Sequence, residues 1–380
     1  MFELGLQQPD GIELDLGTAI GRLRQQSQEN APIGAASPPP AHAQKEPRMN
    51  SVNHQIRLAT RPSGLPSPSD WEPTAEPVPV PGPGEFVVAV SYLSIDPAMR
   101  RWIDDAYFEP VPIGAVMEAG GVGRVTASQH PGFAAGEHVY GAFGVQDFAR
   151  TDGTSVTKLD PLLAPLPAYL GALGTTGLTA YFGLLDVGRI SEGDTVVVSG
   201  AAGAVGSVAG QIAKIKGCRA IGIAGGPEKC SWITGDLGFD AAIDYKSQDV
   251  ARALREHAPG GVDAFLDNVG GEILDAVLTR LARGARIVLS GGVSQYNAQQ
   301  VRGPSHYLEL IRARASMTGM LTPDYADRYQ QARAELAGWL REGRLISRQD
   351  VLHGGVRAFP DALPKLFTGE NTGKLVLAVQ

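Results

Sequence analysis

The sequence predicts an α/β protein that combines a β-rich part with a doubly wound sheet of parallel strands. Short strand-like runs separated by Gly and Pro fill residues 49–168. Strand-like and helix-like runs alternate over residues 169–341, which is the pattern of βαβ units. A β-like pattern returns over residues 342–380, and we expect this segment to rejoin the first part.

Composition limits the classes to which the protein can belong. The chain has 380 residues, of which 43% are hydrophobic and 19% charged, so it can bury the cores of two domains. A net charge of −7 argues against general nucleic-acid binding. No apolar run is long enough to cross a membrane, and Met1–Gly17 lacks the pattern of a secretory signal. Cys218 and Cys230 fit a reducing compartment, so we expect a cytoplasmic protein.

The first 48 residues differ from the rest of the chain. They are rich in Pro, Ala and polar residues, so residues 1–48 are predicted to be a disordered extension. A short amphipathic helix at 14–26 fits the pattern, and Met49 is a candidate start of the folded part.

The alternating region can be divided into elements. We expect strands at 195–199, 219–224, 241–244, 262–267 and 286–290, and helices at 205–216, 228–235, 250–257, 272–283 and 326–341.

The strongest local signal is a glycine-rich turn between a strand and a helix. Thr195–Ser199 is an apolar strand, and GAAGAVG at 200–206 leads into the next helix. Glycines allow a pyrophosphate to approach the backbone, and a helix N-terminus stabilises its charge. A glycine turn without a ligand is the alternative. The expected contacts are Gly200, Ala201, Gly203, Ala204, Val205 and Gly206.

The second strand ends without the acidic residue that usually binds an NAD ribose. Ala224 is followed by Gly225 and Gly226, and Lys229 lies shortly after them. A carboxylate would repel a 2′-phosphate, whereas a lysine attracts one. Lys229, with Tyr245 after the third strand, therefore favours NADP(H) over NAD(H). A solvated lysine is the alternative interpretation.

Several motifs together resemble the zinc-free medium-chain dehydrogenases/reductases. The resemblance is to the NADP-dependent leukotriene B4 12-hydroxydehydrogenase/prostaglandin reductase and alkenal reductase group. It spans about residues 50–380, in the family's order. The stretches are 93–100 (LSIDPAMR), 177–183 (GLTAYFG), 199–207 (SGAAGAVGS), 224–229 (AGGPEK), 267–272 (DNVGGE) with 291–297 (GGVSQYN), and 369–374 (GENTGK).

The resemblance implies a GroES-like catalytic domain, closed by the C-terminal strand, and an inserted Rossmann domain. The active site would lie between them and use NADPH to reduce α,β-unsaturated aldehydes or ketones. A homodimer through edge strands of the Rossmann sheets is also implied, and residues 315–321 could supply that edge.

The matched motifs also imply contacts with the cofactor. Gly203–Gly206 would meet the pyrophosphate, and Lys229 and Tyr245 the 2′-phosphate. Asn268 would lie beside the nicotinamide, and Asn371 would reach across the cleft. Gly225, Ser290 and Gly291 complete the expected cofactor residues.

Two departures from the family pattern bear on the active site, one at the substrate pocket and one near the nicotinamide. Ala98 replaces the tyrosine of the usual Asp-Pro-Tyr-Met-Arg, which would reshape the substrate pocket. Gly-Thr-Thr-Gly at 174–177 replaces the usual Gly-Met-Pro-Gly. Tyr92 is a second candidate for the pocket, with a place in the core as the equal alternative.

Tyr296 is the candidate catalytic residue. Conjugate reduction places negative charge on the carbonyl oxygen, and a hydrogen-bond donor there is what the protein must add. Tyr296 follows the fifth strand, at the edge where such sheets bind ligands, and a phenol stays protonated at neutral pH. The resemblance points to the same residue. The α-carbon proton could come from Tyr296, from a ribose hydroxyl or from water.

We expect no catalytic metal. Both cysteines lie in the Rossmann half, and no pair of histidines has i, i+4 spacing among His130, His138, His257, His306 and His353. Quinone reduction and NADPH binding without catalysis are the alternative functions, and the SQYN motif favours the reduction of enones. Alcohol oxidation is disfavoured by the missing zinc ligands.

Overall fold

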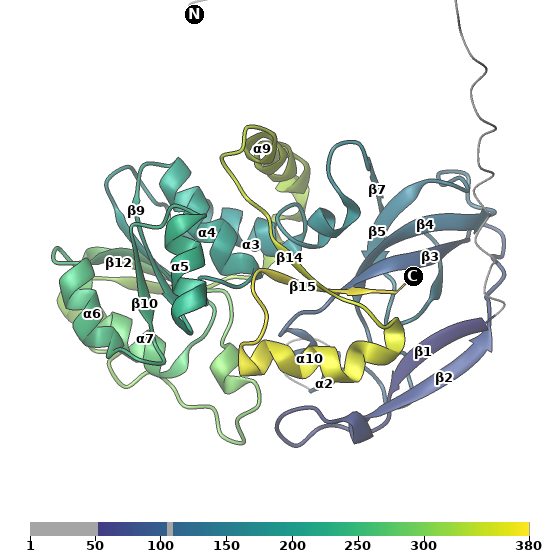
Figure 1. The fold of residues 1–380 in the computed structure, drawn as a ribbon, viewed down its shortest axis with the longest axis horizontal. Helices are drawn as coiled ribbons and strands as arrows, with labels where there is room; N and C mark the ends of the chain where they lie inside the picture. Colours follow the sequence, from purple (N-terminus) through teal and green to yellow (C-terminus); the bar gives the residue numbers. More distant parts are fainter. Residues whose placement is uncertain (1–51, 105–108, 380) are drawn as a thin grey trace, which may run out of the picture. The chain divides into compact units, whose positions relative to one another are not determined.

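The structure is a computed structural model that describes residues 52–104 and 109–379 (Figure 1). The extension predicted for residues 1–48, the helix at 14–26 and Met49 lie outside the described residues.

Six parallel strands form the sheet of the alternating region. In spatial order they are β10 (Ala241–Asp244), β9 (Arg219–Ala224), β8 (Thr195–Ser199), β11 (Val262–Asp267), β12 (Leu281–Leu289) and β13 (Ser316–Gly319). The chain starts in the middle, at β8, and builds outward in both directions. This order defines the doubly wound dinucleotide-binding fold, so the predicted α/β class is confirmed.

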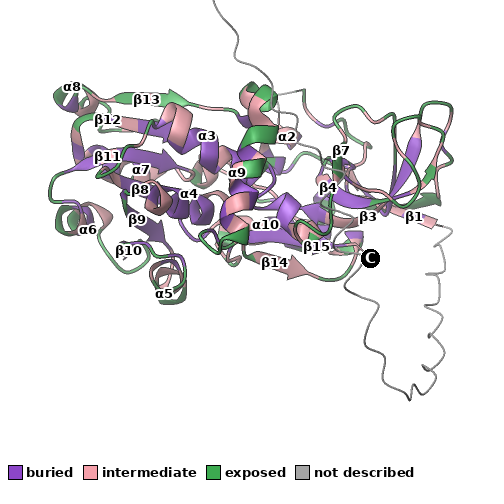
Figure 2. Cartoon of the chain, turned by 90° about the horizontal axis from the view of Figure 1, so that it is seen from above, coloured by how far each residue is buried: buried purple, intermediate pink, exposed green. Residues whose placement is uncertain are grey.

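Both faces of this sheet are covered by helices and buried. Successive side chains of a strand point to opposite faces, so neighbouring residues enter two different apolar clusters. In β8, Val196 and Val198 join one apolar cluster and Val197 joins another. The first cluster lies against helices α3 (Thr175–Phe182), α4 (Ala204–Ile215), α5 (Pro227–Gly235) and α9 (Tyr329–Arg341). The second lies against α6 (Val250–His257), α7 (Gly271–Leu278) and α8 (Glu309–Ala313). Figure 2 shows β8, β9 and β11 as buried between these layers.

One predicted boundary is wrong. The helix expected at 272–283 ends at Leu278, and β12 begins at Leu281 instead of Arg286. Gly284 has φ +79°, which a right-handed helix cannot accommodate. The pairing of β12 with β11 shifts register after Leu281, so the early part of the strand lacks a regular alternation.

The β-rich part contains a second sheet. It is built in the order β14 (Gln349–Leu352), β15 (Lys374–Ala378), β3 (Phe86–Ser94), β4 (Gly120–Ser128), β5 (His138–Ala142) and β7 (Thr157–Leu159), and β6 (Phe148–Thr151) also pairs with β3. The last strand, β15, runs antiparallel to β3, as Figure 1 shows in yellow beside blue. Helix α10 (Phe359–Thr368), which the sequence pattern did not predict, packs Phe359 and Leu363 into the core of this part.

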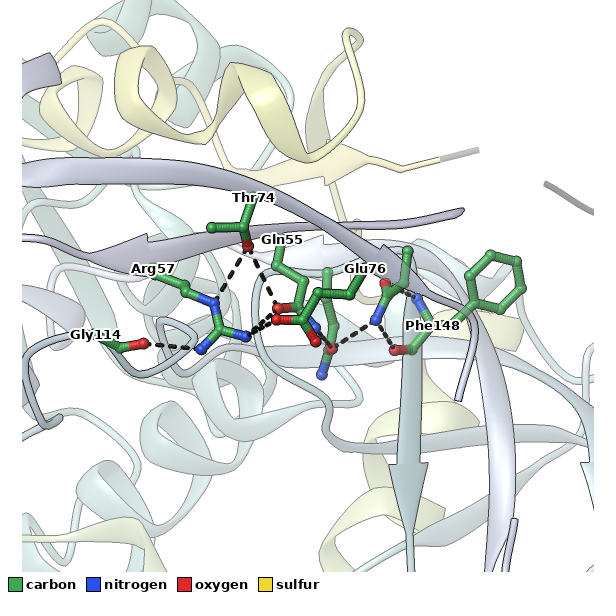
Figure 3. A network of polar contacts seen from close by, with 8 residues as sticks. Gln55, Arg57, Thr74, Glu76, Gly114 and Phe148 are labelled. Carbon is green, nitrogen blue, oxygen red and sulfur yellow. Dashed lines mark hydrogen bonds and ion pairs between the residues drawn. The ribbon is translucent and has the colours of Figure 1, made fainter. Parts of the chain in front are cut away.

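A hairpin of β1 (Val52–Leu58) and β2 (Trp71–Pro77) adds to the β-rich part. Arg57 holds it together, because its guanidinium donates to Thr74 Oγ1 at 3.2 Å and to the Gly114 carbonyl at 2.9 Å (Figure 3). Asn53 binds both backbone groups of Phe148, which ties the hairpin to β6.

Residues 50–380 form one compact unit. The division into 49–168, 169–341 and 342–380 therefore stays a prediction.

Two glycine-to-alanine substitutions should have opposite effects on stability. A Cβ on Gly206 would lie 2.3 Å from the Gly200 carbonyl oxygen, so Gly206→Ala should destabilise the fold by about 1–3 kcal/mol. A Cβ on Gly338, within α9, would have no neighbouring atom within 4 Å, so Gly338→Ala should stabilise the fold by about 0.5–1 kcal/mol. Denaturant unfolding of both variants measures this. Equal effects would contradict the tight loop geometry.

Candidate active site

A cavity of about 710 Å³ lies at the carboxyl ends of β8, β11 and β12. In the doubly wound fold, ligands bind where the strand order reverses, which here is between β8 and β11. The opposite wall comes from residues 94–98, at the end of β3 and just after it, and from α10. The C-terminal motif at 369–374 and the residue that follows it complete this wall. The cavity therefore lies between the parallel sheet and the β-rich part.

The glycine-rich loop follows β8 and forms one side of the cavity. Gly200 has φ +58°, and the Gly203 amide donates to the Gly200 carbonyl at 2.8 Å. Gly203 is the N-cap of the twelve-residue helix α4, whose first amides are available to an anion. Residues 200 and 203–206 line the cavity. Ala201 does not, because it is buried in the core and its amide donates to Ile223.

A positively charged corner lies beyond the end of β9. Lys229, Gly225 and Tyr245 all line the cavity. A Cβ on Gly225 would lie 2.9 Å from the Tyr245 hydroxyl, so glycine is needed for the tyrosine to approach. Burial and the neighbouring Lys246 lower the pKa of the Lys229 ammonium, which donates to the Gly369 carbonyl at 2.7 Å. Lys246, which sequence reasoning missed, is a second cation at this corner.

The acidic residue that directly precedes Tyr245 is already engaged. Asp244, at the end of β10, accepts the Gly226 amide at 2.7 Å and the Lys246 amide at 3.0 Å. The bond from Gly226 is the main reason that the pKa of Asp244 is lowered. Its carboxylate therefore stabilises the turn that carries the corner.

Asn268 is held rigidly at the end of β11. Its side-chain amide donates to the Ser199 carbonyl at 2.7 Å, and its Oδ1 accepts the Ser290 hydroxyl at 2.7 Å. Beneath it, the Asp267 carboxylate is fully buried and accepts Ser199 Oγ at 2.6 Å. Asn268, Ser290 and Gly291 line the cavity, as predicted cofactor residues would.

Tyr296 follows a short 3₁₀ turn, Val293–Gln295, and faces the cavity. Its hydroxyl oxygen accepts the Gly292 amide at 3.0 Å. In this bond the oxygen contributes a lone pair and not its O–H. The guanidinium of Arg101 lies 5.8 Å from the ring centre, so a residue of the β-rich part contacts this tyrosine.

The substrate side of the cavity combines apolar and hydroxyl groups. Ala98 lines it, whereas Tyr92 lies outside the lining and packs against the large apolar cluster. Sequence reasoning missed Trp102 and Tyr140, which also line the cavity. The Tyr140 hydroxyl lies 3.3 Å from Thr175 Oγ1, so the Gly-Thr-Thr-Gly departure brings hydroxyls to this wall.

The C-terminal motif crosses from one wall to the other. The Gly373 amide donates to the Ala202 carbonyl in the glycine-rich loop at 2.8 Å. Asn371, which lines the cavity, donates to the Gly373 carbonyl at 3.0 Å. The next residue, Lys374, is buried and donates to the Ile95 carbonyl at 2.6 Å and to Asp96 Oδ1 at 2.9 Å. One short segment thus joins the glycine-rich loop to the wall that carries Ala98.

The described ranges, 52–104 and 109–379, contain neither a cluster of metal ligands nor a membrane-spanning helix. No three His, Cys, Asp or Glu side chains there form a group that could hold a metal ion. No helix in these ranges has the length and apolar character to span a membrane.

Comparison with known families identifies both parts of the chain. Residues 54–159 match the N-terminal domain of oxidoreductases, and residues 204–338 match the zinc-binding dehydrogenase domain. The NADPH-dependent curcumin reductase of Escherichia coli is 39% identical over 86% of this chain and 97% of its own. The 2-alkenal reductase (NADP⁺-dependent) of Nicotiana tabacum is 38% identical over 86% and 97%.

A solved structure has the same fold. The crystal structure of CurA in complex with NADPH from Vibrio vulnificus superposes with a TM-score of 0.82, is 42% identical and covers 86% of this chain and 99% of its own. The fold, the site and these relatives agree, so the chain belongs to the NADP-dependent oxidoreductases of the medium-chain dehydrogenase/reductase family.

Proposed function

We propose that this protein uses NADPH to reduce the C=C bond of an α,β-unsaturated aldehyde or ketone, without a metal. The observation that carries the proposal is one cavity lined by a cationic corner, a helix N-terminus and the Tyr296 hydroxyl. The named activities of the curcumin and 2-alkenal reductases support the choice of substrate class.

The cavity residues fit the charge distribution of NADP(H). The amides at the start of α4 suit the pyrophosphate, and Lys229 with Tyr245 suits the 2′-phosphate. Asn268 and Ser290 suit the nicotinamide half because they lie at the ends of β11 and β12. When bound, the cofactor supplies the hydride for the β-carbon of the substrate.

A residue of this chain stabilises the negative charge that develops on the carbonyl oxygen of the substrate. The Tyr296 hydroxyl donates to that oxygen and stabilises the enolate. A phenolic O–H is a hydrogen-bond donor of the kind that this oxygen needs. Trp102, Leu366 and Phe367 give the cavity apolar surface, which excludes water and strengthens the bond.

A homodimer through β13 is consistent with the fold. This strand is one edge of the parallel sheet, and an uncovered edge is a template for pairing. Tyr307, Leu308 and Ile311 are exposed apolar residues on or just before α8, which precedes this edge. We also infer a cytoplasmic location, because both cysteines carry free thiols.

The function is tested by following NADPH oxidation with panels of enals, enones and quinones, together with product analysis. We expect saturated carbonyl products from enones, and we expect dialysis against a chelator to leave the rate unchanged because no residue in the mechanism binds a metal. Turnover of quinones alone would replace the proposed substrate class. A loss of rate that zinc restores would overturn the metal-free mechanism.

Lys229→Ala should raise the KM for NADPH about 10–100-fold, because a charged hydrogen bond contributes about 1.5–3 kcal/mol. The KM for NADH should change far less, since NADH lacks the 2′-phosphate. Lys246→Ala tests the second cation of the corner, and Lys158→Ala, an exposed lysine paired with Glu137, is the matched control. Parallel rises for both cofactors would remove Lys229 from the recognition of the phosphate.

Tyr296→Phe should lower kcat about 100–1,000-fold, the usual effect of removing a donor to a developing oxyanion. NADPH affinity should change little, because the ring remains. Tyr307→Phe removes the same hydroxyl from an exposed position and should leave kcat unaltered. Steady-state kinetics with one enone measure all three enzymes. A variant as fast as the wild type would exclude Tyr296 from the mechanism.

A further inference from the structure

We propose that Arg100 is a positioning residue that holds the Tyr296 loop, residues 291–298, in its reactive place through the side chain of Asn297. The inference rests on the proposed function, in which Tyr296 meets the substrate oxygen. Arg100 itself is not among the residues that line the cavity.

Arg100 belongs to α2 (Met99–Ile103), in the β-rich part, and its side chain is 5% exposed. Its Nε donates to Asn297 Oδ1 at 3.1 Å, across 197 positions of sequence. Asn297 directly follows Tyr296. The side-chain contact therefore joins the substrate wall to the loop that carries the candidate catalytic hydroxyl.

The guanidinium is also held on its own side of the cavity. Its single Nε–H is shared, because it also points to the Gly64 carbonyl at 3.1 Å. Nη2 donates to the Pro62 carbonyl at 3.1 Å, and Nη1 forms an ion pair with Asp104 at 2.5 Å. Because the guanidinium is planar and rigid, the bonds of Nη1 and Nη2 orient Nε toward Asn297.

The start of the Tyr296 loop is anchored to the parallel sheet. Val293 and Ser294 donate their amides to the carbonyls of Asn268 and Val269, and the Tyr296 hydroxyl accepts the Gly292 amide. After Asn297, residues 298–304 form neither helix nor strand. The hydrogen bond from Arg100 therefore holds the end of the loop from the β-rich part, beside the contact of the Arg101 guanidinium with the Tyr296 ring. A displacement of about 1 Å at a reacting group can lower a rate about 100-fold.

A purely structural role for Arg100 is the competing explanation, since burying a guanidinium without its partners is costly. Substitution at Asn297 separates the two explanations. Asn297→Ala removes the acceptor but leaves the contacts of Arg100 with Pro62, Gly64 and Asp104. Asn297→Asp keeps an acceptor oxygen for Nε. Gln300→Ala, an exposed amide three residues further, is the matched control.

Steady-state kinetics with one enone test the functional part of the inference. We expect Asn297→Ala to lower kcat about 10–100-fold without changing the Kd of NADPH. Asn297→Asp should restore most of the rate, and Gln300→Ala should match the wild type. In a Tyr296→Phe background, Asn297→Ala should cause no further loss. An unchanged kcat, or the same loss in both backgrounds, would overturn the positioning role.

Hydrogen–deuterium exchange tests the geometry independently of turnover. The amides of residues 291–298 should exchange faster in Asn297→Ala than in the wild type, and Arg100→Lys should have the same effect. In Asn297→Ala, exchange elsewhere should be unaltered. If the wild type reduces no enone, the proposed function fails, and the exchange comparison alone decides whether Arg100 holds the loop. Equal exchange in wild type and Asn297→Ala would overturn the inference.

Discussion

The buried carboxylate of Asp267 holds together the two loops on which the cavity depends. It ends β11 and accepts the hydroxyl of Ser199, which ends β8, together with the amides of Val269 and Gly270. Burial raises the pKa of this carboxyl, and the three donors offset that cost. The bond from Ser199 is the one that joins the two strand ends. The glycine-rich loop and Asn268 both start from this junction.

A second constraint comes from the C-terminal motif, which ties the parallel sheet to the β-rich part. Gly373 binds the glycine-rich loop, and Lys374 binds the turn after β3 that carries Ala98. Desolvation lowers the pKa of Lys374, and the nearby Asp96 opposes that shift. The buried pair thus fixes the substrate wall relative to the loop at the other end of the same short segment. The shape of the cavity follows from these contacts more than from any one strand.

The sequence could predict the features that depend on local spacing. The glycine loop, the Lys229 corner and the alternation of strands and helices are encoded within short windows, and the structure has them at those positions. Tyr92 shows the limit. It lies two residues before Ser94, which lines the cavity, but its ring packs against the apolar cluster instead. That choice depends on the residues that surround the ring, which come from distant segments of the chain.

Cavity residues that come from distant segments of the chain could not be predicted from the sequence either. Trp102 and Tyr140 come from two separate elements, and only the packing of the chain places them around one cavity. Arg100 reads as an ordinary helical arginine until its contact with Asn297 is known. The end of the helix at Leu278 was missed for a related reason, because apolar residues at helical spacing continue into β12 and the register shift is set by β11.

The position of Lys229 links recognition of the cofactor to the same crossing segment. Its ammonium has three donors, of which one binds the Gly369 carbonyl at the start of the C-terminal motif. A 2′-phosphate at this corner would share the lysine with that carbonyl and would raise the pKa that burial and Lys246 now lower. Binding of the phosphate therefore favours the arrangement in which the motif lies across the cavity.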